Sequence, residues 1–436
     1  MNRFKNLILS IRRLFQKFGP ITIFRKTLFV LRLEGLKGVM LRIKRIKNRH
    51  RIATISELLN ASFENASPLR IFLTPPSQTK RLSMVTDSIN RGSLYGGVGT
   101  AMIFVALLAE STRSRLRIVT RTEPAQPSNF SHVLNTYGIS LSQEVEFVYA
   151  PCDSSTYEVD IFQNELFVTT SWWGTAATMA SVPHRSIIYL LQEDERMFYP
   201  YGDERLHCEQ VFKNKDIRFV INSRLLFDHL VADGFENISQ HAYWFEPAFP
   251  KTIFYPRDKQ GGKHTLMFYA RPNNLRNLFY FGIELLEKAI VRGVIDLSHW
   301  EIVLVGKDIP DLIFAGGYTP VFRENMNWLE YAELIGTVDL GLCLMYTPHP
   351  SYPPLDLAAS GAIAVTNRFL NKDDLSGYSK NILTAELDQE SMLVALEEGL
   401  RLAVGDEERN LNFSNTSLET DWSTAFAGVL EAMRGE

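Results

Sequence analysis

The stretch Thr337–Asn367, TVDLGLCLMYTPHPSYPPLDLAASGAIAVTN, contains the pattern that decides the fold of this chain. Its first apolar run, Leu340–Met345, is short and uncharged, which predicts a strand buried on both faces of a parallel sheet. A loop with three prolines follows, and Pro354 is predicted to open a helix with Asp356 in its first turn. The next apolar run, Ala362–Thr366, predicts a second strand.

A unit of this kind places the loop and the start of the helix at the carboxyl end of the first strand, where ligands of open α/β sheets bind. The first N–H groups of a helix have no partner inside the helix and point at this place. The pattern therefore predicts an anion at the start of the helix that Pro354 opens.

Apolar runs alternate with helical or polar connections along most of the chain, which is typical of parallel sheets covered by helices. The segment Tyr243–Lys263 is rich in proline, glycine and charge and is predicted to be a linker between two sets of strands. The first set is Met84–Ile89, Leu116–Arg121, Val145–Ala150, Leu166–Ser171, Ser186–Leu191 and Phe219–Ser223. The second set is Thr265–Ala270, Glu301–Val305, Leu340–Met345 and Ala362–Thr366. The sequence thus predicts two α/β halves.

Charge is distributed unevenly over the 436 residues. The net charge is −3, but residues 1–51 hold fifteen Lys and Arg against one acid, Glu34. The remainder is therefore acidic, which argues against extended contact with nucleic acid. Apolar residues recur at helical spacing in residues 1–50, so this basic arm is predicted to form short amphipathic helices on an anionic membrane surface. A helical hairpin docked on the protein itself or on a partner is the alternative.

Membrane-spanning and metal-binding patterns are absent from the sequence. No run reaches eighteen uncharged apolar residues, so no transmembrane helix is predicted. Cys152, Cys208 and Cys343 show neither a pairing pattern nor metal-type spacing, which suits a reducing cytoplasm. Because no Asp-x-Asp pair occurs either, no bound metal is predicted.

Two arginines follow the first predicted strand of the second half. Arg271 lies at the carboxyl end of Thr265–Ala270, and Arg276 precedes a helix predicted for Leu278–Ala289. Two guanidiniums at this place could bind a diphosphate; the alternative is that both are surface arginines in a loop.

A glycine-rich turn with Gly96 and Gly97 precedes an apolar helix in the first half. The turn lacks the glycine spacing of dinucleotide-binding and P-loop motifs, so the turn alone predicts only a tight connection.

An acidic run, Gln192–Pro200, follows the predicted strand Ser186–Leu191. Its acids are expected to face the cleft between the halves, where Glu195, or in second place Asp194, would orient or deprotonate an acceptor hydroxyl. A solvated acidic loop is the alternative. Trp172 and Trp173 are expected either to stack on a sugar or to belong to the core.

The segment HPSYPPLDLAASGAIAVTN, residues 349–367, resembles the donor-binding segment of GT-B glycosyltransferases, most closely that of the WsaF-like bacterial rhamnosyltransferases. The run Gln192–Pro200 is similar to a Gln, acid, Glu and Phe-Tyr-Pro run in the same enzymes. In the wider family two glutamates eight residues apart bracket the donor loop. Asp356 takes the place of the second, which reaches the ribose, and Pro348 that of the first, so the resemblance passes the sugar contact to His349.

This resemblance implies a GT-B fold, in which two Rossmann-like domains face an interdomain cleft. The expected parts are residues 1–65, a basic helical arm; 66–245, the acceptor domain; 246–410, the nucleotide-sugar domain; and 411–436, a helix crossing back to the first domain. The resemblance implies catalytic roles for Arg271, Arg276, Glu195 and Asp194. It implies nucleotide-sugar binding by Gly96, Gly97, His349, Ser351, Tyr352, Leu355 and Asp356, and contact with the base by Val321–Asn327.

The implied activity is metal-independent and cofactor-independent transfer of L-rhamnose from dTDP-rhamnose to a growing cell-surface polysaccharide, whose acceptor glycan is free or lipid-linked. The implied location is the cytoplasmic, inner face of a bacterial membrane. Three rivals stay open: a GT-B transferase that uses another sugar nucleotide, a GT-B epimerase, and a non-catalytic scaffold of a glycan assembly complex.

Overall fold

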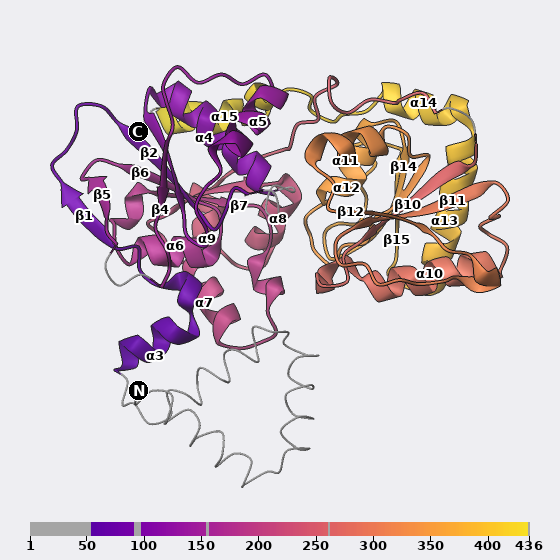
Figure 1. The fold of residues 1–436 in the computed structure, drawn as a ribbon, viewed down its shortest axis with the longest axis horizontal. Coiled ribbons are helices and arrows are strands. Elements are labelled where there is room, and N and C mark those ends of the chain that lie inside the picture. Colours follow the sequence, from indigo (N-terminus) through magenta and orange to yellow (C-terminus); the bar gives the residue numbers. More distant parts are fainter. Residues whose placement is uncertain (1–53, 91–96, 154–156, 260–261, 435–436) are drawn as a thin grey trace, which may run out of the picture. The chain divides into compact units, whose positions relative to one another are not determined.

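The computed structural model describes residues 54–90, 97–153, 157–259 and 262–434 (Figure 1). The predicted basic arm, residues 1–50, and Gly96 lie outside the described residues. The chain divides into two compact units, Met1–Ser67 and Pro68–Glu436. In the first unit the structure describes helix α3 (Ile55–Ser62), where Thr54 and Glu57 form a capping box, and a 3-10 turn, η1 (Glu64–Ala66).

The first half of the second unit contains a seven-stranded sheet with the order β4-β3-β2-β6-β7-β8-β9, in which every pair is parallel. The chain enters at β2, winds outward through β3 and β4, and returns to β6 to wind the other way, which is the Rossmann-like order. The strands are β2 (Arg81–Thr86), β3 (Arg115–Thr120), β4 (Glu146–Tyr149), β6 (Leu166–Thr169), β7 (Ile187–Leu191), β8 (Arg218–Asn222) and β9 (Tyr243–Phe245).

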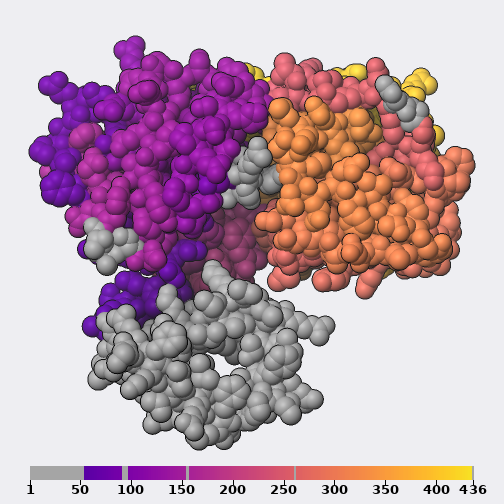
Figure 2. All heavy atoms as spheres, viewed as in Figure 1, coloured from indigo at the N-terminus to yellow at the C-terminus, as the bar shows by residue number. Residues whose placement is uncertain are grey.

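The second half repeats this plan with six parallel strands in the order β12-β11-β10-β13-β14-β15. The strands are β10 (His264–Ala270), β11 (Trp300–Gly306), β12 (Val321–Glu324), β13 (Leu340–Leu342), β14 (Ile363–Asn367) and β15 (Ile382–Ala385). A separate parallel pair joins β1 (Ile71–Thr74) to β5 (Val159–Phe162). Strand β1 runs along the surface of the first half, indigo in Figure 2, where Phe72 is 61% exposed.

Helices connect the parallel strands and cover the sheets (Figure 1). In the first half they are α4 (Gly97–Thr112), α5 (Pro127–Thr136), α6 (Trp172–Met179), α7 (Asp203–Phe212), α8 (Arg224–Ala232) and α9 (Glu236–His241). In the second they are α10 (Phe279–Val291), α11 (Trp328–Ile335), α12 (Tyr352–Ala359), α13 (Gln389–Val404) and α14 (Asp406–Ser414). No helix within the described residues has the length and apolarity that crossing a membrane requires.

The last helix, α15 (Trp422–Arg434), packs on α4 and β9 of the first half. The ring centroid of Phe426 lies 5.0 Å from that of Phe104 in α4 and 4.4 Å from that of Phe245 in β9. Helix α4 is buried along most of its length, and the α15 side chains complete the apolar cluster around it. The first half therefore depends on a segment that follows the second half in the chain.

Each sheet has one point where the strand order reverses, between β2 and β6 in the first half and between β10 and β13 in the second. The connections that leave such neighbouring strands diverge to opposite faces, which opens a crevice at the carboxyl ends. Asp87 and Thr170 follow β2 and β6, and Arg271 and the segment 343–351 follow β10 and β13. The fold thus brings Arg271 and the predicted donor loop, residues 345–351, to one crevice.

The predicted fold class, α/β with two Rossmann-like domains, is confirmed. Strands β1, β5, β9, β12 and β15 were not predicted, because each has only three or four residues and no more than three successive apolar residues; β9 takes the first three residues of the predicted linker. Helix α12 begins at Tyr352, two residues before the predicted start at Pro354. Proline is tolerated throughout the first turn, where its missing N–H breaks no helical bond.

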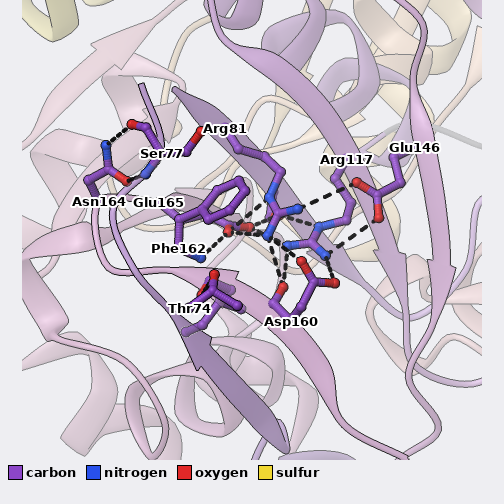
Figure 3. A network of polar contacts seen from close by, with 11 residues as sticks. Thr74, Ser77, Arg81, Arg117, Glu146, Asp160, Phe162, Asn164 and Glu165 are labelled. Carbon is purple, nitrogen blue, oxygen red and sulfur yellow. Dashed lines mark hydrogen bonds and ion pairs between the residues drawn. The ribbon is translucent and has the colours of Figure 1, made fainter. Parts of the chain in front are cut away.

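A buried ionic network lies at the amino-terminal end of the first sheet, away from the crevice (Figure 3). Glu165, just before β6, accepts hydrogen bonds of 2.7 Å from Arg81 at the start of β2 and from Arg117 in β3. Asp160 and Glu146 also pair with both guanidiniums. Because every charge in the network has partners, it can tie three central strands together without leaving an uncompensated buried ion.

Candidate functional site

A cavity of about 420 Å³ is lined by residues that follow the strands on either side of both switch points. From the first half the lining includes Asp87, Gly97, Trp173, Gln192, Glu193, Glu195 and Phe198. From the second half it includes Arg271, Arg276, Gly306, Lys307, Met345, His349, Ser351, Tyr352 and Asp356. Most residues predicted from the sequence to form the site are thus brought together.

Arg271 and Lys307 supply positive charge to this cavity. Arg271 directly follows β10 and Lys307 directly follows β11, so adjacent parallel strands deliver both cations to one place. Neither has an acidic partner among the described residues, and the guanidinium of Arg271 contacts only the hydroxyl of Tyr269, at 3.4 Å. Gly306 makes this approach possible, because a Cβ there would lie 1.7 Å from the carbonyl oxygen of Ala270.

Arg276 reaches across to the first half, where it meets Glu193. Its Nη1 lies 2.6 Å from Oε2 of Glu193, and its guanidinium lies 4.3 Å from the ring centroid of Phe198. The other oxygen of Glu193 accepts a hydrogen bond from Thr347 of the donor loop. A carboxylate of the first half therefore neutralises the second predicted arginine.

The backbone of Met345, where the donor loop begins, is held from two sides. Asn367 at the end of β14 accepts a hydrogen bond from the Met345 N–H at 2.8 Å and donates to its carbonyl at 3.1 Å. Lys372 donates to the same carbonyl at 2.9 Å and is fully buried, and burial lowers the pKa of this lysine to about 7. The loop therefore leaves β13 from a fixed point.

Helix α12 offers fewer free N–H groups than the sequence predicted. An α-helix leaves four N–H groups at its start without an internal partner, here those of Ser351 and of positions 352 to 354. Ser351 donates its N–H to Nδ1 of His349 at 2.9 Å, and Pro353 and Pro354 have none. Of these four groups, only the N–H of Tyr352 is free to bind a ligand. The anion at the start of α12 stays a prediction, and charged side chains would have to provide most of the attraction for it.

Three buried polar atoms of the donor loop and helix have no hydrogen-bond partner among the described residues: His349 Nε2, Ser351 Oγ and Asp356 Oδ1. All three residues line the cavity. Ser351 also has φ 71° and ψ 148°, a conformation that residues other than glycine rarely adopt. Unpaired buried polar groups are costly, and together with a strained backbone they are typical of a ligand site.

Asp356 lies in the second turn of α12 and is 2% exposed. Its Oδ2 accepts a hydrogen bond of 3.2 Å from the hydroxyl of Tyr331. Burial raises the pKa of Asp356 well above its ordinary value. A second cavity, of about 730 Å³, begins beyond Asp356 and Tyr352 and continues along aromatic rings, among them Trp328. Asp356 thus lies between two cavities that share part of their lining.

The two predicted acids of the first half differ in their surroundings. Glu195 lines the cavity and accepts a hydrogen bond of 2.7 Å from the N–H of Trp172, while burial raises its pKa to about 8. Asp194 does not line the cavity. Burial alone would raise the pKa of Asp194, but hydrogen bonds from His229 and Arg196 lower it to about 2. Asp194 is therefore suited to hold the turn that carries Glu195 rather than to contact a ligand.

The tryptophan pair after β6 is divided between the core and the cavity. Trp172 is buried and donates its indole N–H to Tyr199 at 3.0 Å. Trp173 lines the cavity and donates to the carboxylate of Asp87 at 2.8 Å. Only Trp173 is therefore placed where a sugar could stack on it.

Gly97 is packed closely within the first half, and Tyr352 joins the two halves at the cavity. Gln192 donates to the carbonyl of Gly97 at 2.6 Å, and a Cβ at Gly97 would lie 3.0 Å from the same amide nitrogen. The hydroxyl of Tyr352 lies 2.6 Å from Oγ1 of Thr100 and accepts a hydrogen bond from Asn222 at 2.8 Å. Leu355 is fully buried in the apolar core and does not line the cavity, so only its backbone could serve a ligand there.

Sequence reasoning did not single out Asp87, Lys307, Glu193 or Lys372 for a role. Asp87, Glu193 and Lys307 each lie within two residues of the end of a parallel strand, and that position was the available signal. Lys372 carries no such signal, because it reaches Met345 from a turn after β14. Within the described ranges, no group of three His, Cys, Asp or Glu side chains could hold a metal ion.

Solved structures similar to this chain share its fold. HepE of Anabaena, solved with UDP and glucose, matches with a TM-score of 0.56 and 12% identity over 82% of this chain and all of that one. Sucrose-phosphate synthase of Thermosynechococcus elongatus matches with a TM-score of 0.55 and 11% identity over 81% of this chain and 98% of that one. At such identities the likeness concerns the two-domain GT-B fold alone.

A curated relative and two family models are closer in sequence. The O-antigen biosynthesis protein RfbC of Myxococcus xanthus is 29% identical over 257 residues, which are 56% of this chain but only 19% of that protein. This chain thus aligns with about a fifth of its relative. The WsaF N-terminal domain model matches residues 81–224, and the WsaF C-terminal domain model matches residues 264–397. Because the two matches together cover more than half of the residues and follow the two halves of the fold, the chain belongs to the WsaF-like glycosyltransferases.

Proposed function

We propose that this protein transfers a sugar from a nucleotide-sugar donor to a glycan, and that the donor is dTDP-rhamnose. The observation that carries the proposal is the guanidinium of Arg271, which has no acidic partner among the described residues and lines the same cavity as the unpartnered polar atoms of His349, Ser351 and Asp356. A cation without an acidic partner beside unpaired hydrogen-bonding groups suits an anionic, polar ligand such as a nucleotide sugar.

In this proposal the diphosphate lies between Arg271 and Arg276, with Lys307 near its nucleoside side. Sugar transfer leaves the nucleoside diphosphate with more negative charge than it carries in the donor. Fixed cations that face this charge stabilise the transition state more than the ground state. Arg276 would exchange the carboxylate of Glu193, 2.6 Å away, for a phosphate oxygen. The chemistry needs no metal ion for this step.

The nucleoside is assigned to the region that the two cavities share. Asp356 would hold the ribose hydroxyls through the Oδ1 atom that has no partner among the described residues. A ribose hydroxyl can donate to this oxygen if the carboxyl is ionised, or accept from it if the carboxyl is protonated. Asn325 and Met326 border both cavities beside Trp328, and this is where we assign the base.

The acceptor is assigned to the first half. In its ionised form Glu195 would accept the proton of the attacking hydroxyl, and its pKa of about 8 means that this form becomes populated as the pH rises toward 8. Trp173, held by Asp87, offers an aromatic face on the same side of the cavity. Asp194 acts through Arg196 and His229 as a positioning residue.

The sugar and the pathway rest on similarity. The WsaF-like resemblance supports L-rhamnose, and the name of the Myxococcus relative supports a role in O-antigen or a related surface polysaccharide. The Anabaena structure holds UDP and glucose, so a uridine donor is the main alternative. We also propose that the basic residues 1–50 attach the enzyme to an anionic membrane surface, which the fifteen positive charges in residues 1–51 support.

The test is a donor panel with purified full-length protein. Labelled dTDP-rhamnose, UDP-glucose and other nucleotide sugars are offered with an acceptor glycan extract, and transfer and donor hydrolysis are measured. Transfer from dTDP-rhamnose alone is expected. Product from another donor only would refute the rhamnose assignment, and epimerised donor without transfer would identify an epimerase.

Arg271→Gln separates catalysis from a scaffold role. Removing an unpaired cation that faces the leaving group should reduce kcat by about 100-fold or more while the protein stays folded, by the magnitude typical for loss of one transition-state contact. Arg185→Gln is the matched control, because Arg185 is exposed in the 3-10 turn His184–Ser186 and lines neither cavity. Unchanged glycan extension by Arg271→Gln in cells would support the scaffold alternative.

A further inference from the structure

The hydrogen bond between Ser351 and His349 fixes the tautomer of the imidazole. The N–H of Ser351 donates to Nδ1 of His349 at 2.9 Å. A backbone N–H can only donate, so Nδ1 carries no proton and the single proton of the neutral ring is on Nε2. Burial lowers the pKa of His349 to about 4 although the nearby carboxylate of Glu193 acts in the opposite direction, so the ring is neutral near pH 7.

The Nε2–H group of His349 has no hydrogen-bond acceptor among the described residues. His349 is 4% exposed. The ring nevertheless lines the cavity that holds Arg271 and Glu195. A buried donor without an acceptor destabilises the protein, so an acceptor on a ligand would regain that free energy on binding.

The ring is also held in place. The loop starts at the clamped backbone of Met345 and ends at Ser351, whose left-handed φ of 71° keeps its N–H aimed back at Nδ1. The Tyr352 ring lies 6.1 Å from the imidazole and is itself bonded to Thr100. A donor fixed in direction before the ligand arrives costs little ordering entropy on binding, which is the property that a specificity determinant needs.

We propose that His349 donates a hydrogen bond from Nε2 to an uncharged oxygen of the transferred sugar, and so selects the donor by its sugar rather than by its diphosphate. The inference rests on the proposed function. Two chemical matches support it: the charged diphosphate is complementary to the guanidiniums of Arg271 and Arg276, whereas a neutral N–H is complementary to a hydroxyl or ring oxygen.

The test compares two ligands on the full-length protein by calorimetry, dTDP-L-rhamnose and dTDP. His349→Phe keeps a flat ring and removes the donor, and His349→Gln keeps an amide N–H near the position of Nε2. We expect His349→Phe to weaken dTDP-rhamnose binding about 10-fold to 100-fold and to change dTDP binding less than twofold. His349→Gln should recover part of the loss, and His299→Gln, an exposed histidine, should change neither.

Equal weakening of both ligands would mean that Nε2 contacts the diphosphate, and unchanged binding of both would mean that it contacts no ligand; either result overturns the inference. Wild-type protein that binds neither ligand would contradict the dTDP donor of the proposed function, and UDP-glucose with UDP then carries the same comparison.

A second measurement does not depend on variants that fold. In ¹⁵N-labelled wild-type protein, the His349 ring should show a protonated Nε2 and a bare Nδ1. The Nε2–H signal should move when the nucleotide sugar binds and stay within the spread of the other histidines when the nucleoside diphosphate binds. A protonated Nδ1, or equal movement with both ligands, would overturn the inference.

Discussion

Glu195→Gln should change how the stability of this protein depends on pH. Burial raises the pKa of Glu195 to about 8, from the ordinary value of 4.5 that a glutamate has in the unfolded chain. The folded state therefore binds more protons than the unfolded state between these two values, so Glu195 lowers the free energy of unfolding as pH rises through that window. The difference of about 3.5 pH units corresponds to about 5 kcal/mol above pH 8, of which about 3 kcal/mol is already lost at pH 7.

Glutamine keeps an oxygen for the Trp172 N–H, 2.7 Å from Glu195, but cannot ionise. The variant should therefore melt close to the wild type at pH 5 and well above it at pH 9. A gain of about 4 kcal/mol over this range corresponds to roughly 10 °C in a domain of this size. The assay is thermal unfolding of both proteins at half-unit steps from pH 5 to pH 9. Melting curves that stay parallel would refute the assignment of a protonated, buried carboxyl to the cavity.

Three other substitutions test the architecture around the site. Glu165→Leu should lower the free energy of unfolding by about 3–5 kcal/mol in denaturant titrations, because it leaves two buried guanidiniums without their shared carboxylate; a loss under 1 kcal/mol would contradict this. Gly306→Ala should abolish donor binding, measured by calorimetry, because its Cβ would lie 1.7 Å from the carbonyl oxygen of Ala270; wild-type affinity would show that the strand ends are not tightly packed. Glu193→Gln should tighten dTDP binding several-fold, since Arg276 no longer has to leave a carboxylate; weaker binding would show that Glu193 assists the donor.

Most of the fold could be predicted from the sequence, because parallel strands buried on both faces appear as continuous apolar runs. The runs at Thr265–Ala270 and Leu340–Met345 identified the two central strands of the second sheet, and with them the crevice. Short edge strands such as β12 and β15 have no such run and were missed. Their strand conformation follows from pairing with a neighbour, which no local pattern encodes.

The candidate site was predictable in its residues and less so in its chemistry. Arg271, Glu195, His349, Ser351 and Asp356 all line one cavity, as strand ends and family resemblance led us to expect. The sequence predicts Pro354 as the first residue of α12, whereas the helix begins two residues earlier, at Tyr352. The sequence also could not show which charges pair, since that depends on contacts between residues far apart in the chain.

Glu193 and His349 show that charge pairing and proton position cannot be read from the sequence. Their sequence neighbours give no hint that one neutralises Arg276 or that the other has an imidazole proton fixed on Nε2. Both facts arise where loops from different strands meet. The electrostatics of this site is therefore a property of the assembled fold.

The position of α15 determines when the first half can finish folding during translation. The first half is synthesised first, yet the apolar face of α4 stays uncovered until Trp422 and Phe426 have left the ribosome. Domains that finish early normally fold while the rest is being made. In this protein the apolar face of α4 stays exposed until the entire second half has been synthesised. Chaperones that bind apolar surfaces would therefore be expected to bind the nascent first half.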